Sequence, residues 1–163
     1  MRRWILLAGL ALASCVADPA PLPQPAVPVV SPTPLPTLPY IVPTNPPLDC
    51  GPEAAIALAQ TQSDLALAAA AEVDAIAQTT ADSALIAQSG QKAFGLGLEL
   101  MGYYDVPECL LQAKVFAVHF FEERIAAYDA LAAGDDSAYD THLNNAELAR
   151  QNMVTVVNGV LGQ

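Results

Sequence analysis

Apolar residues recur at intervals of three and four along most of the chain after residue 50, the spacing that gathers side chains on one face of an α-helix. The spacing is clearest over 107–133 and over 137–160. In the first segment, we expect the inward-facing residues to be Leu111, Val115, Val118, Phe121, Ile125, Tyr128 and Ala132. In the second, we expect them to be Tyr139, Leu143, Ala146, Met153, Val156 and Val160.

The ends of the segment 107–133 carry typical helix signals. Asp105 is placed as an N-cap, Pro107 falls in the first turn, and Glu108 completes a capping box. Gly134 stands where a left-handed C-cap residue belongs. Asp135 and Asp136 then precede the segment 137–160, and negative charge at a helix start is favoured by the helix dipole. We therefore expect two helices joined by a short turn.

Residues 52–106 give a weaker signal, because the stretch is rich in alanine. They could form one long helix, two helices that separate at Ser89 and Gly90, or two nearly equal helices that separate around 79–82, where Thr80 or Asp82 offers an N-cap. Local signals alone favour the break at Gly90. Between residues 53 and 87, 14 of 35 residues are alanine, so we expect these helices to approach their neighbours closely or to curve.

We predict that Cys50 and Cys109 form a disulfide, and this bond decides between the three alternatives. Each lies two residues from a proline that begins a predicted helix, and a disulfide requires α-carbons within about 7 Å. Only the break near residue 80 returns the chain to the end where it started. We predict an all-α, antiparallel up-down four-helix bundle with helices near 52–78, 81–104, 107–133 and 137–160. Two independent buried thiols, or a link between two molecules, are the alternatives.

The first fourteen residues are typical of a secretory signal peptide. Arg2 and Arg3 precede ten uncharged residues, fewer than the roughly 20 that a membrane span needs. The stretch ends in Leu-Ala-Ser-Cys at 12–15, which resembles the lipobox of bacterial lipoproteins. The resemblance implies cleavage before Cys15, lipidation of its thiol with diacylglycerol, and an extracytoplasmic protein anchored to the cell membrane. Val16 resembles the outer-membrane-sorted type; the choice of membrane stays open, as do an ordinary secretory signal and an uncleaved anchor.

Residues 16–49 hold 12 of the 14 prolines. Proline removes an amide donor and keeps the preceding residue extended, so this segment cannot form a helix or a sheet. We expect a disordered, polyproline-like linker with a reach of up to about 100 Å. A recognition ligand for an aromatic groove is the alternative. The predicted organisation is a signal peptide at 1–14, a lipidated Cys15 and linker at 15–49, and a helical domain at 50–163.

The charge of the chain excludes one class of partner. Seventeen acidic residues oppose six basic ones, a formal net charge of -11 at pH 7. Nucleic-acid binding depends on clustered Lys and Arg, and only four basic residues follow Cys15. Loss of Arg2 and Arg3 with the signal peptide would make the charge more negative still. We expect no nucleic-acid partner.

Candidate ligands for a metal or cofactor are few. His119, Glu122 and Glu123 lie within one helical turn, but in a hairpin that turns at Gly134 the second histidine, His142, is about 12 Å away along the axis. That spacing argues against a shared metal, and we expect no metal or cofactor.

The remaining polar candidates have weaker support. In the same register Glu123 lies beside Arg150, which predicts a surface salt bridge. His119 and Met153 are roughly level, so a non-covalent haem is geometrically conceivable. Asp135, Asp136 and Asp140 could hold Ca²⁺ weakly, although acids that open a helix are usually a solvated cap.

No catalytic motif stands out. The chain lacks the Gly-x-Ser-x-Gly elbow of hydrolases, a phosphate-binding glycine loop and the Cys-x-x-Cys-His motif of covalent haem. We therefore expect a non-enzymatic, lipid-anchored module that binds another component of the cell envelope, such as a protein partner, or has a structural role there. A carrier of a small ligand, haem or metal in a pocket of the bundle is the alternative function, and an unrecognised hydrolase is the least favoured.

Overall fold

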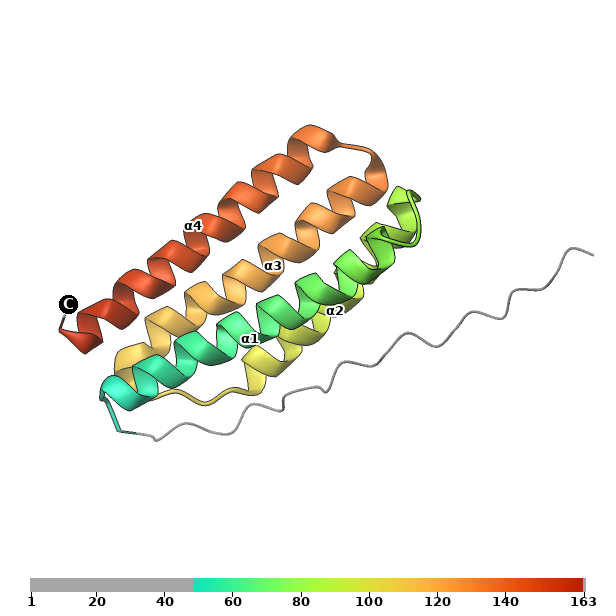
Figure 1. Cartoon of the computed structure of the whole chain (residues 1–163). Coiled ribbons are helices and arrows are strands. Elements are labelled where there is room, and N and C mark those ends of the chain that lie inside the picture. Colours follow the sequence, from blue (N-terminus) through green and yellow to red (C-terminus); the bar gives the residue numbers. More distant parts are fainter. Residues whose placement is uncertain (1–48, 163) are drawn as a thin grey trace, which may run out of the picture. The chain divides into compact units, whose positions relative to one another are not determined.

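The structure, a computed structural model, describes residues 49–162. These residues form no strand but four α-helices, which are α1 (Pro52–Ala77), α2 (Ser83–Tyr103), α3 (Leu111–Ala133) and α4 (Asp136–Leu161). Successive helices run antiparallel and pack on each other, and α4 returns to α1 (Figure 1). The predicted all-α up-down four-helix bundle is therefore confirmed. The predicted signal peptide, Cys15 and the proline-rich segment lie outside the described residues.

The break between α1 and α2 falls near residue 80, as the cysteine geometry predicts. The Thr79 hydroxyl donates to the Ile76 carbonyl at 2.8 Å, and the Thr80 hydroxyl accepts from the Asp82 amide at 3.0 Å. The Asp82 carboxylate is the N-cap of α2, because it accepts from the Ala84 amide at 2.9 Å. Short polar side chains therefore end one helix and begin the next without a glycine.

The predicted N-cap at Asp105 is wrong. The chain after Pro107 first forms a 3-10 turn, η1 (Glu108–Leu110), and α3 begins only at Leu111. Neither η1 nor α3 has a side-chain cap. A capping box requires an α-helical first turn, and the tighter 3-10 turn does not supply that geometry.

The turn between α3 and α4 has the predicted C-cap. Gly134 has a φ of 71°, in the left-handed region that suits glycine. Its amide donates to Leu131 at 3.1 Å, and the Asp135 amide donates to Ala130 at 3.0 Å, which satisfies carbonyls at the end of α3. The Asp135 carboxylate then accepts from the Ala138 amide at 2.9 Å and caps α4.

The predicted inward face of α3 is only partly correct. Phe121 and Tyr128 are buried as expected, but Leu111 and Val115 are 51% and 63% exposed, and Ala132 is also exposed. Val118 and Ile125 are partly buried against the core. The helix also buries five residues outside the predicted stripe, which are Ala113, Ala117, Phe120, Ala127 and Ala130. Apolar residues occur all around α3, so their spacing does not determine which face packs inward.

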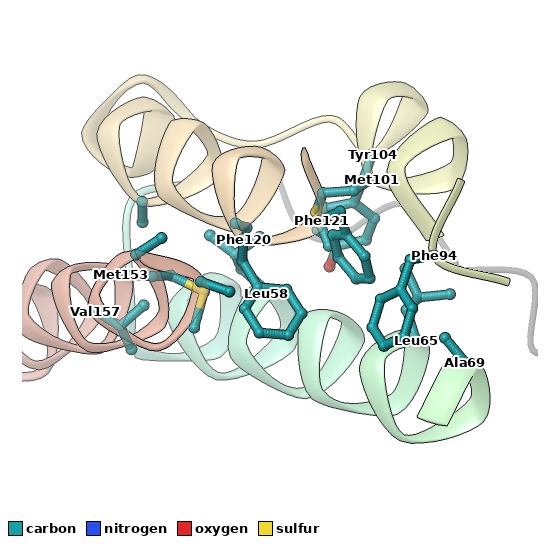
Figure 2. Close-up of a cluster of buried hydrophobic side chains, with 14 of the residues drawn as sticks. Leu58, Leu65, Ala69, Phe94, Met101, Tyr104, Phe120, Phe121, Met153 and Val157 are labelled. Carbon is teal, nitrogen blue, oxygen red and sulfur yellow. The ribbon is translucent and has the colours of Figure 1, made fainter. Parts of the chain in front are cut away.

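The inward face of α4 is closer to the prediction. Ala146 and Met153 are buried, and Tyr139, Val156 and Val160 are partly buried against the core. Leu143 is only half-buried. The core itself is formed by large side chains from all four helices, among them Leu58, Phe94, Phe121 and Met153 (Figure 2). None of the helices within residues 49–162 is both long enough and apolar enough to cross a bilayer.

The predicted disulfide between Cys50 and Cys109 is present. Their α-carbons lie 6.0 Å apart, within the range that the bond requires. Cys50 precedes α1 and Cys109 lies in η1 before α3, so the bond joins the starts of two helices that run in the same direction. Both cysteines are exposed.

Candidate functional site

The sequence-predicted residues His119 and Glu123 meet at the interface of α3 and α4. The Glu123 carboxylate accepts from His142 Nδ1 at 2.8 Å and from the Asn145 amide at 3.2 Å, both on α4. Its other oxygen lies 3.5 Å from Nε2 of His119, one turn earlier on α3. The two imidazoles therefore flank one carboxylate, so their side chains lie closer together than the separation of about 12 Å along the axis that helical register predicts.

The environment of Glu123 favours its charged form. Partial burial raises the pKa of this carboxyl, but the hydrogen bonds from His142 and Asn145 and the charges of both imidazoles outweigh it and hold the pKa below its ordinary value. The carboxylate is thus ionised at neutral pH and lies between two groups that can each carry a proton.

The predicted salt bridge between Glu123 and Arg150 is wrong. Arg150 pairs instead with Glu147, one turn before it on α4, with Nε 2.8 Å from one carboxylate oxygen and an Nη 2.6 Å from the other. Hydrogen bonds from Arg150 and from Gln151 lower the pKa of Glu147 to about 2. Glu147, on the same helix as Arg150, is nearer to it than Glu123 on α3, so the guanidinium of Arg150 binds Glu147.

A shallow groove lies beside this cluster on the α3–α4 interface. Its volume is about 350 Å³, and it is lined by Phe116 and His119 from α3 and by residues of α4 that include Leu148 and Asn152. The lining of the groove therefore includes apolar side chains and the side-chain amide of Asn152. Within residues 49–162, no three His, Cys, Asp or Glu side chains have an arrangement that could hold a metal ion.

The structure does not bring the haem candidates together. Met153 is 2% exposed and packs in the core of the bundle (Figure 2). The His119 side chain is 49% exposed and lines the outer groove of α3 and α4. The two side chains thus face different regions.

The acidic residues at the start of α4 serve the helix itself. Asp135 is the N-cap, Asp136 lies in the first turn, and Asp140 is exposed. Carboxylates in these positions stabilise the helix dipole. Their geometry is that of a solvated cap.

A second hollow, the α1–α4 cleft, is lined by two residues that no sequence motif marks, Gln62 and Arg124. Gln62 is 3% exposed and Arg124 is partly buried. The guanidinium carbon of Arg124 lies 4.6 Å from the centroid of the Phe94 ring. A signal was present in the sequence, because Gln62 interrupts an apolar stripe of Leu58, Leu65 and Ala69, and Arg124 lies one turn after Phe120 and one turn before Tyr128.

Comparison with known proteins gives no match. No family model matches the chain, and no curated protein and no solved structure matches it significantly.

Proposed function

We propose that the chain is a non-enzymatic lipoprotein of the cell envelope, in which Cys15 carries the lipid, the proline-rich segment is a spacer, and the acidic bundle binds or supports another envelope component. The disulfide between Cys50 and Cys109 carries this proposal. Such bonds form and persist outside the reducing cytoplasm. The lipobox-like residues 12–15 and the charged segment before them support the same location.

The charge of the bundle supports a position away from the membrane surface. All 17 acidic residues follow Cys15, and an anionic lipid surface repels such a domain. Two acyl chains on Cys15 would hold the chain firmly, since each buried methylene contributes about 0.8 kcal/mol. A spacer between anchor and bundle reconciles firm attachment with this repulsion.

The use of the titratable side chains supports a non-enzymatic role. Asp82 and Asp135 cap helices, and Glu147 pairs with Arg150 on an exposed helix face. Glu123 holds α3 to α4 through His142. Each of these groups is engaged in stabilising the bundle.

Metabolic labelling with an alkyne analogue of palmitate tests the anchor. We expect the parent protein to take up the label and to enter the detergent phase on Triton X-114 partition, whereas Cys15→Ala takes up none. The control Cys50→Ala removes a different cysteine and keeps the label. Label that persists in Cys15→Ala, or an unlabelled parent that stays in the aqueous phase, contradicts the proposal.

The oxidised state is tested separately on the parent protein. We expect maleimide to leave Cys50 and Cys109 unmodified in denaturant alone and to modify both after reduction. Free thiols before reduction would contradict the extracytoplasmic location.

A further inference from the structure

The α1–α4 cleft is the larger of the two hollows described above. Its volume is about 440 Å³, within the range of small-molecule sites. One wall is α1, where Ala59, Ala66 and Ala70 leave room, and the opposite wall is formed by Met153 and Val154 of α4. α1 and α4 also touch much less than the other neighbouring helices do.

The floor of the cleft is apolar and aromatic. Phe94 from α2 and Phe120 from α3 line it, and both are buried in the core (Figure 2). The rim is formed by exposed residues, including Leu67 at 66% exposure. A molecule that entered between α1 and α4 would place an apolar body against these rings.

Two buried donors in this cleft lack partners. The Gln62 residue is only 3% exposed, and its side-chain nitrogen Nε2 makes no hydrogen bond. Nε of Arg124 is also buried and unpaired. Burying an amide donor without a partner is unfavourable, and native proteins rarely leave such groups unsatisfied. Both atoms are closed to solvent, so a ligand in the cleft satisfies them only when these two side chains turn toward it.

The charge of Arg124 is also uncompensated. Among residues 49–162, no carboxylate lies within 4.0 Å of its guanidinium, and none lines the cleft. The faces of Phe94 and Tyr128, at 4.6 and 5.8 Å, and the Tyr128 hydroxyl at 3.5 Å are its neighbours. Arg150 at the rim is already paired with Glu147. In a chain with nearly three acids per base, a part-buried guanidinium that has no carboxylate beside it is available for an external anion.

We propose that the α1–α4 cleft binds a small monocarboxylate with an apolar chain, such as a medium-chain fatty acid. The guanidinium of Arg124 receives the carboxylate, the Gln62 amide is the second donor, and the chain lies against Phe94, Phe120 and Met153. A guanidinium presents parallel donors that match a carboxylate. A phosphate dianion fits less well, because one unpaired cation in an apolar cleft leaves its second charge uncompensated.

The net negative charge of the chain does not prevent this binding. Charges farther away than the Debye length, about 8 Å at physiological ionic strength, are largely screened, whereas a buried pair is screened much less. The cleft would bind such a molecule wherever the chain resides, so this site stands or falls independently of the lipid anchor.

Calorimetric titration of the full chain in detergent micelles, with empty micelles as blank, tests the site with octanoate and with octan-1-ol. We expect saturable octanoate binding that weakens about ten- to a hundredfold in Arg124→Gln, the loss of one hydrogen-bonded charge pair. Lys92→Gln is the matched control, because it removes one positive charge at an exposed position of α2 and should change the affinity less than about twofold. The alcohol, which lacks the charge, should bind at least about tenfold more weakly than octanoate.

A second variant keeps the test decisive if Arg124→Gln fails to fold. Ala66→Leu fills the cleft from α1 and retains Arg124, so it should abolish octanoate binding while its helical circular dichroism stays that of the parent. The proposal is overturned by equal octanoate affinity in parent and Arg124→Gln, by octan-1-ol binding as tightly as octanoate, by full binding in Ala66→Leu, or by no binding above the blank.

Discussion

The α2–α3 and α1–α4 interfaces both rely on small residues, with different results. Between α2 and α3, Gly90 lies against the ring of Tyr128 and Gly97 against that of Phe121, so closely that a methyl group on either glycine would overlap the ring. Between α1 and α4, the alanines of α1 have no aromatic ring from α4 opposite them, only Met153 and Val154, and the cleft remains. Small residues close an interface only where the partner helix supplies a large side chain to occupy the space.

Removal of the disulfide should cause the largest loss of stability and should act on the loosely packed side of this comparison, at α1. The bond ties the start of α1, which packs loosely on α4, to the start of α3. The double variant Cys50→Ser, Cys109→Ser should lose about 4 kcal/mol, the chain-entropy contribution of closing 59 residues, and more than about 10 °C in Tm.

Hydrogen exchange should locate the loss in that variant. Amides of α1 should lose protection before those of α2 and α3, since α1 has the weaker packing. Reduction of the parent protein is the control and should lower Tm equally. Melting of the variant at the parent temperature under oxidising conditions would contradict the structural role of the bond.

The close approach of α2 and α3 can be broken by one methyl group. Gly90→Ala forces an overlap with the buried Tyr128 ring that costs about 3 kcal/mol, and the gain in helix propensity returns about 1 kcal/mol, so a net loss of about 2 kcal/mol is expected in urea unfolding. Gly95→Ala on the same helix is the matched control. Nothing lies within 4 Å of a methyl group there, so it should gain about 0.5–1 kcal/mol. If both variants were stabilised, the two helices would not be in the contact described.

Replacing Gln62 in the cleft should stabilise the empty protein and weaken the binding of the proposed carboxylate. Gln62→Leu replaces a buried, unpaired amide with an apolar side chain of similar size, and should stabilise the empty protein by about 1 kcal/mol, or a few degrees in Tm. Gln60→Leu, at an exposed position of α1, should change stability by less than about 0.5 kcal/mol. A lower Tm in Gln62→Leu would show that the amide has a partner, such as a buried water.

One polar contact across the α3–α4 interface, that of Glu123 with His142, should have the smallest effect of the four predicted here. The folded pKa of Glu123 lies below its ordinary value of 4.5, so its carboxylate stabilises the bundle above that pH, and the contribution is lost as the pH falls through the folded pKa. Glu123→Gln should therefore lose up to about 1 kcal/mol at pH 7 and converge on the parent in acid.

The neighbouring exposed carboxylate gives the control for this measurement. Glu122→Gln removes the same charge from the same turn of α3, where the side chain is 55% exposed, and should leave the pH dependence of urea unfolding almost unchanged. Parallel pH profiles for the parent and Glu123→Gln would contradict the role of Glu123.

Features set by local chemistry could be predicted from the sequence. The glycine C-cap at 134 follows from local chemistry in this way. The break near Asp82 does not, because local signals favour a break at Gly90, which lies inside α2; only the geometry of the disulfide places the break near residue 80. Features set by tertiary contacts could not be predicted in this way. The first turn after Pro107 is 3-10 rather than α, and the inward face of α3 includes Ala113 and Ala117 instead of the larger Leu111 and Val115.

The candidate site was less predictable than the fold. Helical register brought Glu123 to the correct interface but assigned it the wrong partner, since a side chain of Arg150 can turn to Glu147 on its own helix. The cleft forms because α1 has small alanine side chains where it faces α4. The residue pattern of one helix does not predict which side chains of a neighbouring helix will lie opposite it. Gln62 in an apolar stripe was the one sign available.

The place of Cys50 has a mechanical consequence. Any tension that arrives along the chain from the residues before it reaches the sulfur bridge before it reaches the first turn of α1 at Pro52. The bridge divides this load between α1 and the 3-10 turn that leads into α3, so two parallel helices are loaded at the same end. Separation of α1, the most weakly packed helix, is then opposed by α3, the best-packed helix of the bundle.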